Sequence, residues 1–259
     1  MNSLETIILG VVQGLTEFLP ISSSGHLVIF QNLLGFSAPE LLLDSALHLG
    51  TLVAVCIYFR SDLRKMVIEA WKFDFKKSNE SLLLWVLVGT VPTGLIGLIF
   101  RSPLESLFGS INMTGTMLIV TGIIIAVTKL IPEDYGKRTS LGLLIALAVG
   151  SAQGLAIIPG ISRSGATIVC GLLCGLDRDL AARFSFLLSL PAITGALILQ
   201  LDSAALERVG LAPLLCGFIC SAVVGLLALR LLMGMVRRGH LYYFAPYCWA
   251  IGLIIVFLF

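Results

Sequence analysis

Apolar segments, most of them about as long as a bilayer is thick, recur along almost the whole chain. A transmembrane helix needs about 20 consecutive apolar residues. Only 12% of the residues are charged and the mean hydropathy is +1.02, whereas a soluble domain carries about a quarter charged residues. The sequence therefore predicts an all-α polytopic membrane protein. Its predicted spans lie at 41–59, 81–100, 111–131, 180–200, 211–233 and 241–259.

Two further apolar stretches are interrupted by polar residues before they reach the length of a span. The first stretch covers 4–34 and is broken by Pro20 and the serines after it, and the second covers 140–176 and is broken at 159–167. Irregular backbone at membrane depth is tolerated only where protein or a water-filled cavity surrounds it. Each stretch is therefore expected to form a re-entrant helix–loop–helix.

The two interrupted stretches share sequence at a fixed spacing of 140 residues. Gln-Gly-Leu at 13–15 recurs at 153–155, and Ser-Ser-Ser-Gly at 22–25 is matched by Ser-Arg-Ser-Gly at 162–165. Two polar breaks that share the same offset of 140 residues indicate a duplicated unit with a site between its copies.

The duplication divides the chain into a first repeat at 1–131 and a second at 140–259, joined by a polar connector at 132–139. Each half has one re-entrant unit and three transmembrane helices. Because three is an odd number of crossings, the halves are predicted to form an inverted-topology repeat. Inverted repeats with broken helices place a binding site near the membrane midplane.

The distribution of positive charge predicts the orientation. Cytoplasmic loops of membrane proteins carry an excess of lysine and arginine. One side of the predicted topology holds 14 of the 17 lysine and arginine residues, in loops 60–80, 129–138, 178–183 and 230–238. The longest of these loops has aromatic residues between its basic ones. It is expected to lie on anionic lipid, and a nucleic-acid patch is the weaker interpretation.

The first break combines groups that are costly in a membrane and therefore usually functional. Gln13 and Glu17 are four residues apart and share a helix face, so their oxygens suit a hard cation such as Mg²⁺ or Ca²⁺. Glu17 could instead act as a general base, or be a buried hydrogen-bonded carboxyl group. His26 is placed to exchange a proton, with a purely structural role as the alternative. The serines before it, Ser22, Ser23 and Ser24, can cap the following helix or contribute to an anion site.

The second break offers a guanidinium group and three hydroxyls. Arg163 can form paired hydrogen bonds with phosphate oxygens, and Ser162, Ser164 and Thr167 can complete an anion site. An arginine in the membrane needs an anion, which Glu17 can supply at rest and a phosphate when a ligand is bound; a permanent Arg163–Glu17 ion pair is the structural alternative. Together the breaks predict phosphoryl chemistry, or phosphate binding, on a molecule reached from the membrane.

These residues resemble the undecaprenyl-pyrophosphate phosphatase family of the bacitracin-resistance type. That family has a (Glu/Gln)-x-x-x-Glu motif, here Gln13 to Glu17, which continues as Phe-Leu-Pro-(Ile/Val)-Ser-Ser-x-Gly-His, here Phe18 to His26. Its second motif, Pro-Gly-x-Ser-Arg-Ser-Gly-x-Thr, corresponds to 159–167. Gln13 stands where the family often has glutamate, and a neutral ligand there should weaken cation binding.

The resemblance implies hydrolysis of undecaprenyl pyrophosphate to undecaprenyl phosphate and inorganic phosphate, which recycles the lipid carrier of bacterial cell-wall synthesis and confers bacitracin resistance. It also implies a divalent cation and an inner-membrane protein whose site faces the periplasm. The family's catalytic positions fall on Glu17, Ser23, His26 and Arg163. Sequence leaves open whether Ser23 or a water molecule attacks the terminal phosphorus.

A second class of function also fits the predicted architecture. Inverted repeats with discontinuous helices are typical of transporters, so the same site could move an anionic polyprenyl lipid across the membrane. The partners expected are the lipid substrate and membrane lipid, with no nucleic acid. Glycine-rich spans such as 89–97 permit a homodimer. The six cysteines lie in apolar segments and are expected to pack there.

Overall fold

The computed structural model describes residues 2–36, 41–72, 81–100, 110–132, 135–200 and 210–258. This part of the chain is helical, and five of its helical segments are long and apolar enough to cross a membrane. The predicted all-α polytopic fold is therefore confirmed. The five are α5 (Leu82–Ile99), α7 (Ile111–Ala126) with η2 (Val127–Leu130), α10 (Arg178–Gln200), α12 (Leu211–Arg237), and η4 (Leu241–Phe244) with α13 (Ala245–Leu258).

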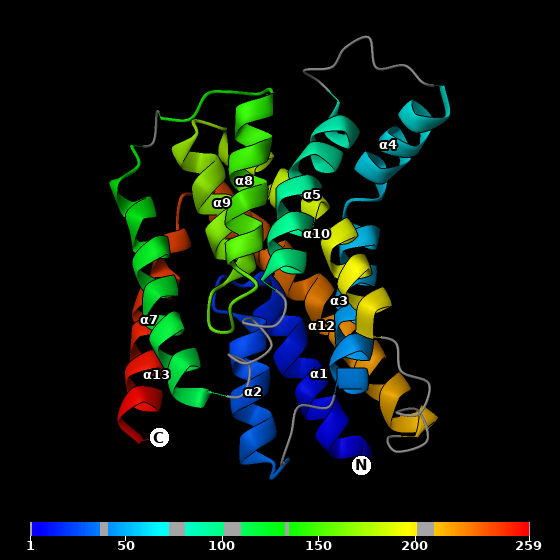
Figure 1. Ribbon diagram of the computed structural model, residues 1–259, viewed down its shortest axis with the longest axis vertical. Helices are drawn as coiled ribbons and strands as arrows, with labels where there is room; N and C mark the ends of the chain where they lie inside the picture. The colour runs from blue at the N-terminus through cyan, green and yellow to red at the C-terminus, as the bar shows by residue number, and fades with distance from the viewer. Residues whose placement is uncertain are drawn as a thin grey trace.

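A sixth candidate span is bent rather than straight. Helix α3 (Leu41–Tyr58) meets α4 (Arg60–Lys72) at an angle of 82°, and α4 projects sideways from the bundle at its upper end (Figure 1). The sequence predicts a loop on the membrane surface at 60–80, but the first 13 residues of this segment form a helix; residues 73–80 lie outside the described part. The bend turns the polar α4 away from the direction of the apolar α3.

Both interrupted stretches form pairs of short helices. The first pair is α1 (Ser3–Phe18) and α2 (Ser23–Leu33), and the second is α8 (Leu143–Leu155) and α9 (Arg163–Leu173). In Figure 1, α1 and α2 both extend toward the end of the molecule where the N-terminus lies, whereas α8 and α9 extend toward the opposite end. The two helix pairs therefore enter the bundle from opposite ends.

Local sequence explains where these short helices begin and end. Asn2 caps α1 in a capping box with Glu5, so two free backbone N–H groups find partners. The helix ends at Phe18 because proline at position 20 disfavours helical backbone in the residue before it. Ser22 and Ser162 cap α2 and α9 through their side-chain oxygens.

Close helix packing holds both pairs in the bundle. Helix α1 packs on α12 and α8 packs on α5, so each broken pair rests on a helix from the other half of the chain. Glycine permits these approaches: a Cβ atom added at Gly14 would lie 2.8 Å from the backbone nitrogen of Gly225. Small residues at such crossings are typical of membrane helices.

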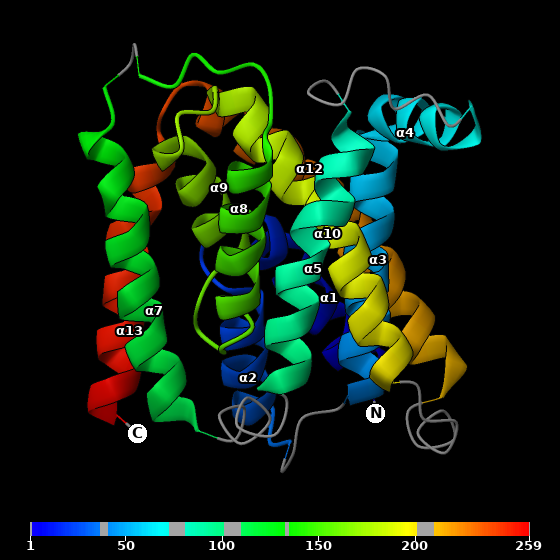
Figure 2. The same cartoon turned by 45° about the horizontal axis from the view of Figure 1, so that its top comes forward.

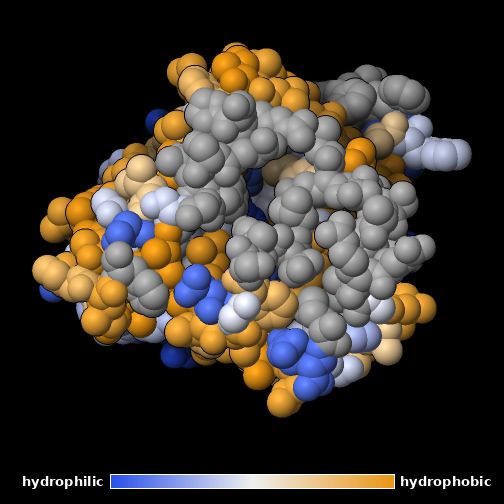
Figure 3. Space-filling model, turned by 60° about the horizontal axis from the view of Figure 1, so that its bottom comes forward, coloured by the Kyte–Doolittle hydropathy of each residue, from blue (hydrophilic) through white to orange (hydrophobic). Residues whose placement is uncertain are grey.

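The largest cluster of buried side chains lies between the helix pairs and the spans. Phe18, Phe184 and Phe186 are fully buried there, and the rings of Phe18 and Phe186 pack edge to face with centroids 5.7 Å apart. Other large apolar side chains are exposed, as expected of a surface in contact with lipid: Leu144 and Phe257 are about four-fifths exposed. Hydrophobic residues also dominate the described surface visible in Figure 3.

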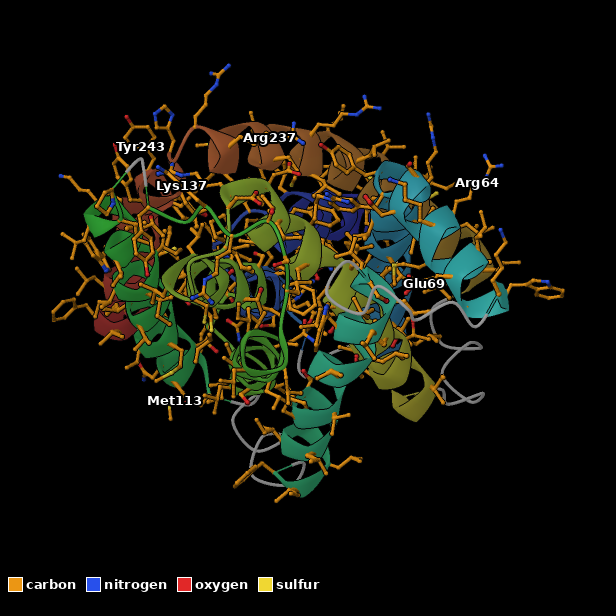
Figure 4. All side chains as sticks on the ribbon, turned by 90° about the horizontal axis from the view of Figure 1, so that it is seen from above. Arg64, Glu69, Met113, Lys137, Arg237 and Tyr243 are labelled. Atoms are coloured by element: carbon orange, nitrogen blue, oxygen red, sulfur yellow. The ribbon has the colours of Figure 1, made fainter. Side chains whose placement is uncertain are left out.

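Basic residues gather at the end of the molecule where α4 projects. Arg64, Lys137 and Arg237 lie around its rim in the view from that end (Figure 4), and the ends of α7 and α12 and the start of α10 lie there too (Figure 2). Ion pairs join the helices at this end: Arg183 of α10 contacts Asp62 of α4, and Arg237 lies 2.7 Å from Asp179. The basic residues labelled in Figure 4 thus lie at one end of the bundle.

Candidate active site

Glu17 and Arg163 meet where the two breaks approach each other. Glu17 lies in the last turn of α1, and Arg163 is the first residue of α9, directly after the capping residue Ser162. The guanidinium group donates a hydrogen bond through Nη2 to Oε1 of Glu17. The side chains are 5% exposed for Glu17 and 16% for Arg163. The breaks thus bring a carboxylate and a guanidinium group of opposite charge into one largely buried contact.

The second carboxylate oxygen of Glu17 accepts hydrogen bonds from two neighbouring side chains. The Ser23 hydroxyl donates to Oε2 over 2.5 Å, and the Gln13 amide donates to the same oxygen over 3.2 Å. A carboxylate that receives donors on both oxygens is the acceptor-only, ionised form. Glu17 is therefore held as an anion in contact with one serine hydroxyl, which is the geometry of a base beside a nucleophile.

His48 also lies at this site, although it is not among the residues predicted from the sequence. Its Nε2 lies 3.7 Å from Oε2 of Glu17, its Nδ1 donates to the backbone carbonyl of Asp44 over 2.7 Å, and its side chain is 27% exposed. Thr51, one turn later on the same helix, accepts a 3.4 Å hydrogen bond from Gln13. The available signal was an imidazole and a hydroxyl three residues apart in an apolar span.

Two of the four serines predicted to bind phosphate cap helices, and the other two lie beside those capping residues. Ser22 accepts from the backbone nitrogen of Gly25 over 3.3 Å, and Ser162 accepts from that of Gly165 over 3.1 Å, so both cap the helix that follows. Ser24 and Ser164 stand next to them, 3.4 and 3.2 Å from the Oγ atoms of Ser22 and Ser162. The first turns of α2 and α9 thus present backbone N–H groups beside the Glu17–Arg163 pair.

Thr167 is not brought to this pair. Its hydroxyl contacts the backbone carbonyl of Arg163 over 2.7 Å and the hydroxyl of Ser185 over 2.6 Å, and the side chain is fully buried. It therefore joins α9 to α10 and supports the helix that carries Arg163. The predicted role of Thr167 in phosphate binding is not supported by a direct contact with the side chains of the Glu17–Arg163 pair.

His26 has partners at both ring nitrogens. Nδ1 lies 2.8 Å from the backbone oxygen of Ser22, and Nε2 lies 2.8 Å from the hydroxyl of Tyr247 on α13. The two rings are nearly parallel, with centroids 5.7 Å apart. Tyr247 was not predicted, because nothing in the sequence connects residues 221 positions apart.

Two buried polar atoms of the site lack a partner within the described residues. They are Oε1 of Gln13, an acceptor, and Nη1 of Arg163, a donor. A buried polar atom without a hydrogen bond costs about 1–3 kcal/mol. These two atoms are therefore suited to a ligand that places an anionic oxygen against Nη1 of Arg163 and a cation or a proton donor against Oε1 of Gln13.

The described residues do not form a complete cation cage, since no group of three or more His, Cys, Asp or Glu side chains is found among them. Glu17 and the free amide oxygen of Gln13 provide two hard oxygen ligands. Mg²⁺ commonly uses one or two carboxylates and takes its remaining ligands from substrate phosphates and water. The donors present therefore fit a cation that arrives with a phosphorylated substrate.

The fold and the site together define a multi-pass membrane protein with a largely buried Glu17–Arg163 contact between two broken helix pairs. The chain belongs to the family described as "Bacitracin resistance protein BacA", which matches residues 6–254.

Curated relatives are similar over nearly their whole length. The chain is 44% identical to the undecaprenyl-diphosphatase of Desulfatibacillum aliphaticivorans, with 97% of each chain covered. It is 45% identical to that of Halothermothrix orenii, over 100% of this chain and 98% of the relative. A protein of the same name from Methanobrevibacter smithii is 39% identical over 98% of this chain and 97% of its own length.

Proposed function

We propose that the protein is an undecaprenyl-diphosphatase, the name its relatives carry, and that it hydrolyses undecaprenyl pyrophosphate to undecaprenyl phosphate and inorganic phosphate. The observation that carries the proposal is the convergence of Ser23 and Arg163 on the carboxylate of Glu17. Phosphoryl transfer requires a positioned nucleophile and positive charge at the phosphate oxygens. This contact brings a hydroxyl, a base and a guanidinium group together.

The diphosphate binds where the two short helices α2 and α9 begin. Backbone N–H groups at a helix N-terminus attract anions, and Nη1 of Arg163, which has no partner in the described part of the chain, can donate to a phosphate oxygen. Arg163 therefore exchanges part of its contact with Glu17 for the substrate. The polyprenyl tail extends from this point along the apolar exterior of the bundle.

Ser23 then attacks the terminal phosphorus and Glu17 accepts the hydroxyl proton. A bond forms between Oγ and phosphorus, the bond from phosphorus to the bridging oxygen breaks, and undecaprenyl phosphate leaves. Glu17 passes its proton to the solvent. It next takes a proton from a water molecule that attacks the phosphoserine and returns that proton to Oγ, which releases inorganic phosphate. The 2.5 Å Ser23–Glu17 hydrogen bond favours this route over direct attack by water.

A divalent cation, Mg²⁺ or Ca²⁺, is proposed as the cofactor. Glu17 and the amide oxygen of Gln13 would hold it, and it would neutralise the charge that develops on the phosphate oxygens. Arg163 supplies the fixed positive charge from the protein's own side chains.

We also propose an inverted-repeat architecture, which packing supports. The pairing of α1 with α12 has its counterpart in α8 with α5, and the pairing of α3 with α12 in α10 with α5, while α7 pairs with α13. Exchanging the two halves reproduces these pairings. With the basic end in the cytoplasm, by the positive-inside rule, α1 and α2 enter from the periplasmic side of the inner membrane.

The same architecture keeps transport of the lipid as a second candidate function. Purified protein in detergent separates the two, since no transport occurs there. We expect inorganic phosphate to be released from undecaprenyl pyrophosphate. Its absence under conditions in which reconstituted protein moves the lipid between leaflets would favour the transporter.

A further inference from the structure

Ser22 has a backbone conformation that serine rarely adopts. Its φ is 69°, and it is the one non-glycine residue with positive φ in the part of the chain that the structure describes. Such conformations cost of order 1–3 kcal/mol and persist when surrounding contacts enforce them. Ser22 directly precedes Ser23, so its backbone determines where the Ser23 hydroxyl lies.

Helix capping does not require this conformation. Ser162 occupies the corresponding place in the second break, caps α9 through the same contact to the glycine three residues on, and has an ordinary φ of −77°. The difference between the breaks is therefore a feature of the first one alone.

The first break also has contacts that the second cannot make. The Ser22 carbonyl accepts from the backbone nitrogen of His26 over 3.2 Å and from the ring nitrogen Nδ1 over 2.8 Å. The residue that matches His26 in the second break is Ala166, whose only available donor is its backbone nitrogen. The imidazole is thus an additional partner for the carbonyl of the strained residue.

Tyr247 completes this chain of hydrogen bonds. A carbonyl oxygen can only accept, so Nδ1 of His26 carries a proton, and the neutral ring offers Nε2 as the acceptor for the Tyr247 hydroxyl. His26 is 3% exposed and its ring stacks on that of Tyr247. Both nitrogens are therefore occupied by groups other than Glu17 and Ser23.

We propose that Tyr247 and His26 are positioning residues for Ser23. Tyr247 fixes the tautomer and ring plane of His26, and His26 holds the carbonyl of Ser22 so that the next residue directs its hydroxyl at Glu17. This inference rests on the proposed hydrolysis. It assigns proton transfer to Glu17 and gives the imidazole the task of keeping a strained turn in place.

Replacing His26 by residues with and without a hydrogen-bond donor tests the assignment. In His26→Asn an amide N–H can replace Nδ1–H, but no basic nitrogen remains. We expect phosphate release within about tenfold of the unaltered protein, because one neutral hydrogen bond contributes about 1 kcal/mol. In His26→Leu we expect a fall of about 100-fold or more, in kcat rather than KM. Equal loss in both variants would overturn the proposal, since it is the result for a proton-transfer group.

Tyr247→Phe tests the other end of the chain. It should lower kcat about five- to tenfold in the unaltered background and have no further effect in His26→Leu, because the two residues act as a unit. Tyr243→Phe is the matched control: Tyr243 is exposed on the preceding helical turn, and the change should leave kcat unaltered. Independent, additive effects of Tyr247 and His26 would contradict the assignment.

The ¹⁵N spectrum of the imidazoles provides a test that does not depend on activity. The chain has three histidines, and His26→Asn identifies the signal of His26. We expect the tautomer protonated at Nδ1 in the unaltered protein and a mixture in Tyr247→Phe. A signal protonated at Nε2 would overturn the proposal even if phosphate is released, whereas the expected spectrum without phosphate release would contradict only the proposed hydrolysis.

Discussion

The guanidinium group of Arg163 contacts the carboxylate of Glu17 across 146 residues of sequence. Each residue lies beside a helix break, and the contact joins the two broken pairs. Because Nη1 of Arg163 has no hydrogen-bond partner among the described residues, the pair is not closed to a further anion. This relationship links the fold to the proposed hydrolysis, since the same arginine neutralises the acid at rest and binds the substrate's phosphate.

Removing Arg163 should abolish activity. Arg163→Ala is expected to reduce phosphate release by about 10³-fold or more, because a fixed guanidinium group contributes on that scale to phosphoryl transfer. It should also destabilise the protein by about 3–5 kcal/mol, since the Glu17 carboxylate is left unpaired. Initial rates and thermal unfolding in detergent measure both effects. Arg64→Ala, an exposed change on α4, should alter neither, and substantial activity in Arg163→Ala would show that another group binds the phosphate.

Ser23 should become phosphorylated during turnover. Brief reaction with substrate labelled in its terminal phosphate, followed by acid quenching, should leave label on the protein in amounts up to one phosphate per chain. Ser23→Ala should prevent labelling and lower kcat by about 10²–10⁴-fold, the range for removal of groups that act directly in catalysis. Ser24→Ala is the control: it removes a neighbouring hydroxyl but retains that of Ser23, so this variant should still be labelled. Unchanged turnover in Ser23→Ala would leave water as the nucleophile.

Gly160→Ala should destabilise the second break. Gly160 has a φ of 94°, and an added Cβ would collide with the backbone oxygen of Thr114 on α7. The expected loss is about 2–4 kcal/mol, from backbone strain and steric overlap together. Gly94→Ala is the control, because its added Cβ meets no atom within 4 Å and a helix interior favours alanine by about 0.5–1 kcal/mol. Unfolding in detergent should shift in opposite directions for the two variants, and equal shifts would count against the predicted strain.

The cation requirement should depend on Gln13. Gln13→Glu places a second carboxylate beside Glu17, so half-maximal activity is expected at a Mg²⁺ concentration about tenfold lower, and a chelator should inactivate both proteins. Gln153→Glu is the control, because it makes the same change in the second break. There the position four residues on, 157, is isoleucine and not glutamate, so the cation requirement should be unaltered. Activity that survives thorough chelation would show that hydrolysis does not require a divalent cation.

Helix α4 should rest on lipid. Trp71 is 86% exposed and Val67 is 66% exposed, between basic residues on a helix bent 82° from α3. In vesicles with anionic lipid, brominated phospholipids should quench the fluorescence of Trp71, which is isolated by comparison with Trp71→Phe. Equal quenching of the two proteins would place α4 away from the bilayer.

Some features were predictable because they depend on local sequence or on repeated spacing. Serine before glycine at both breaks predicts two helix starts, and the offset of 140 residues pairs the breaks from sequence spacing alone. A charged residue in a membrane needs a partner, which made each of them the natural candidate for the other. The roles assigned to these residues remain predictions.

Other features depend on tertiary packing, and the sequence does not show which residues that packing brings together. His48 approaches Glu17 because α3 packs beside α1, and Tyr247 reaches His26 from the last helix of the chain. The positive φ of Ser22 is equally hidden, since Ser162 has almost the same neighbours and an ordinary conformation. Helix α4 was missed because its charges indicated a loop more strongly than its apolar positions indicated a helix.

The most direct test compares phosphate release from undecaprenyl pyrophosphate by the purified protein and by Glu17→Gln, in detergent with Mg²⁺ present. Glutamine retains the size of the side chain but removes the negative charge and the proton acceptor. We expect one inorganic phosphate per lipid from the unaltered protein and a rate lower by about 10³-fold or more in the variant. No release by the unaltered protein, or equal rates in the two, would contradict it.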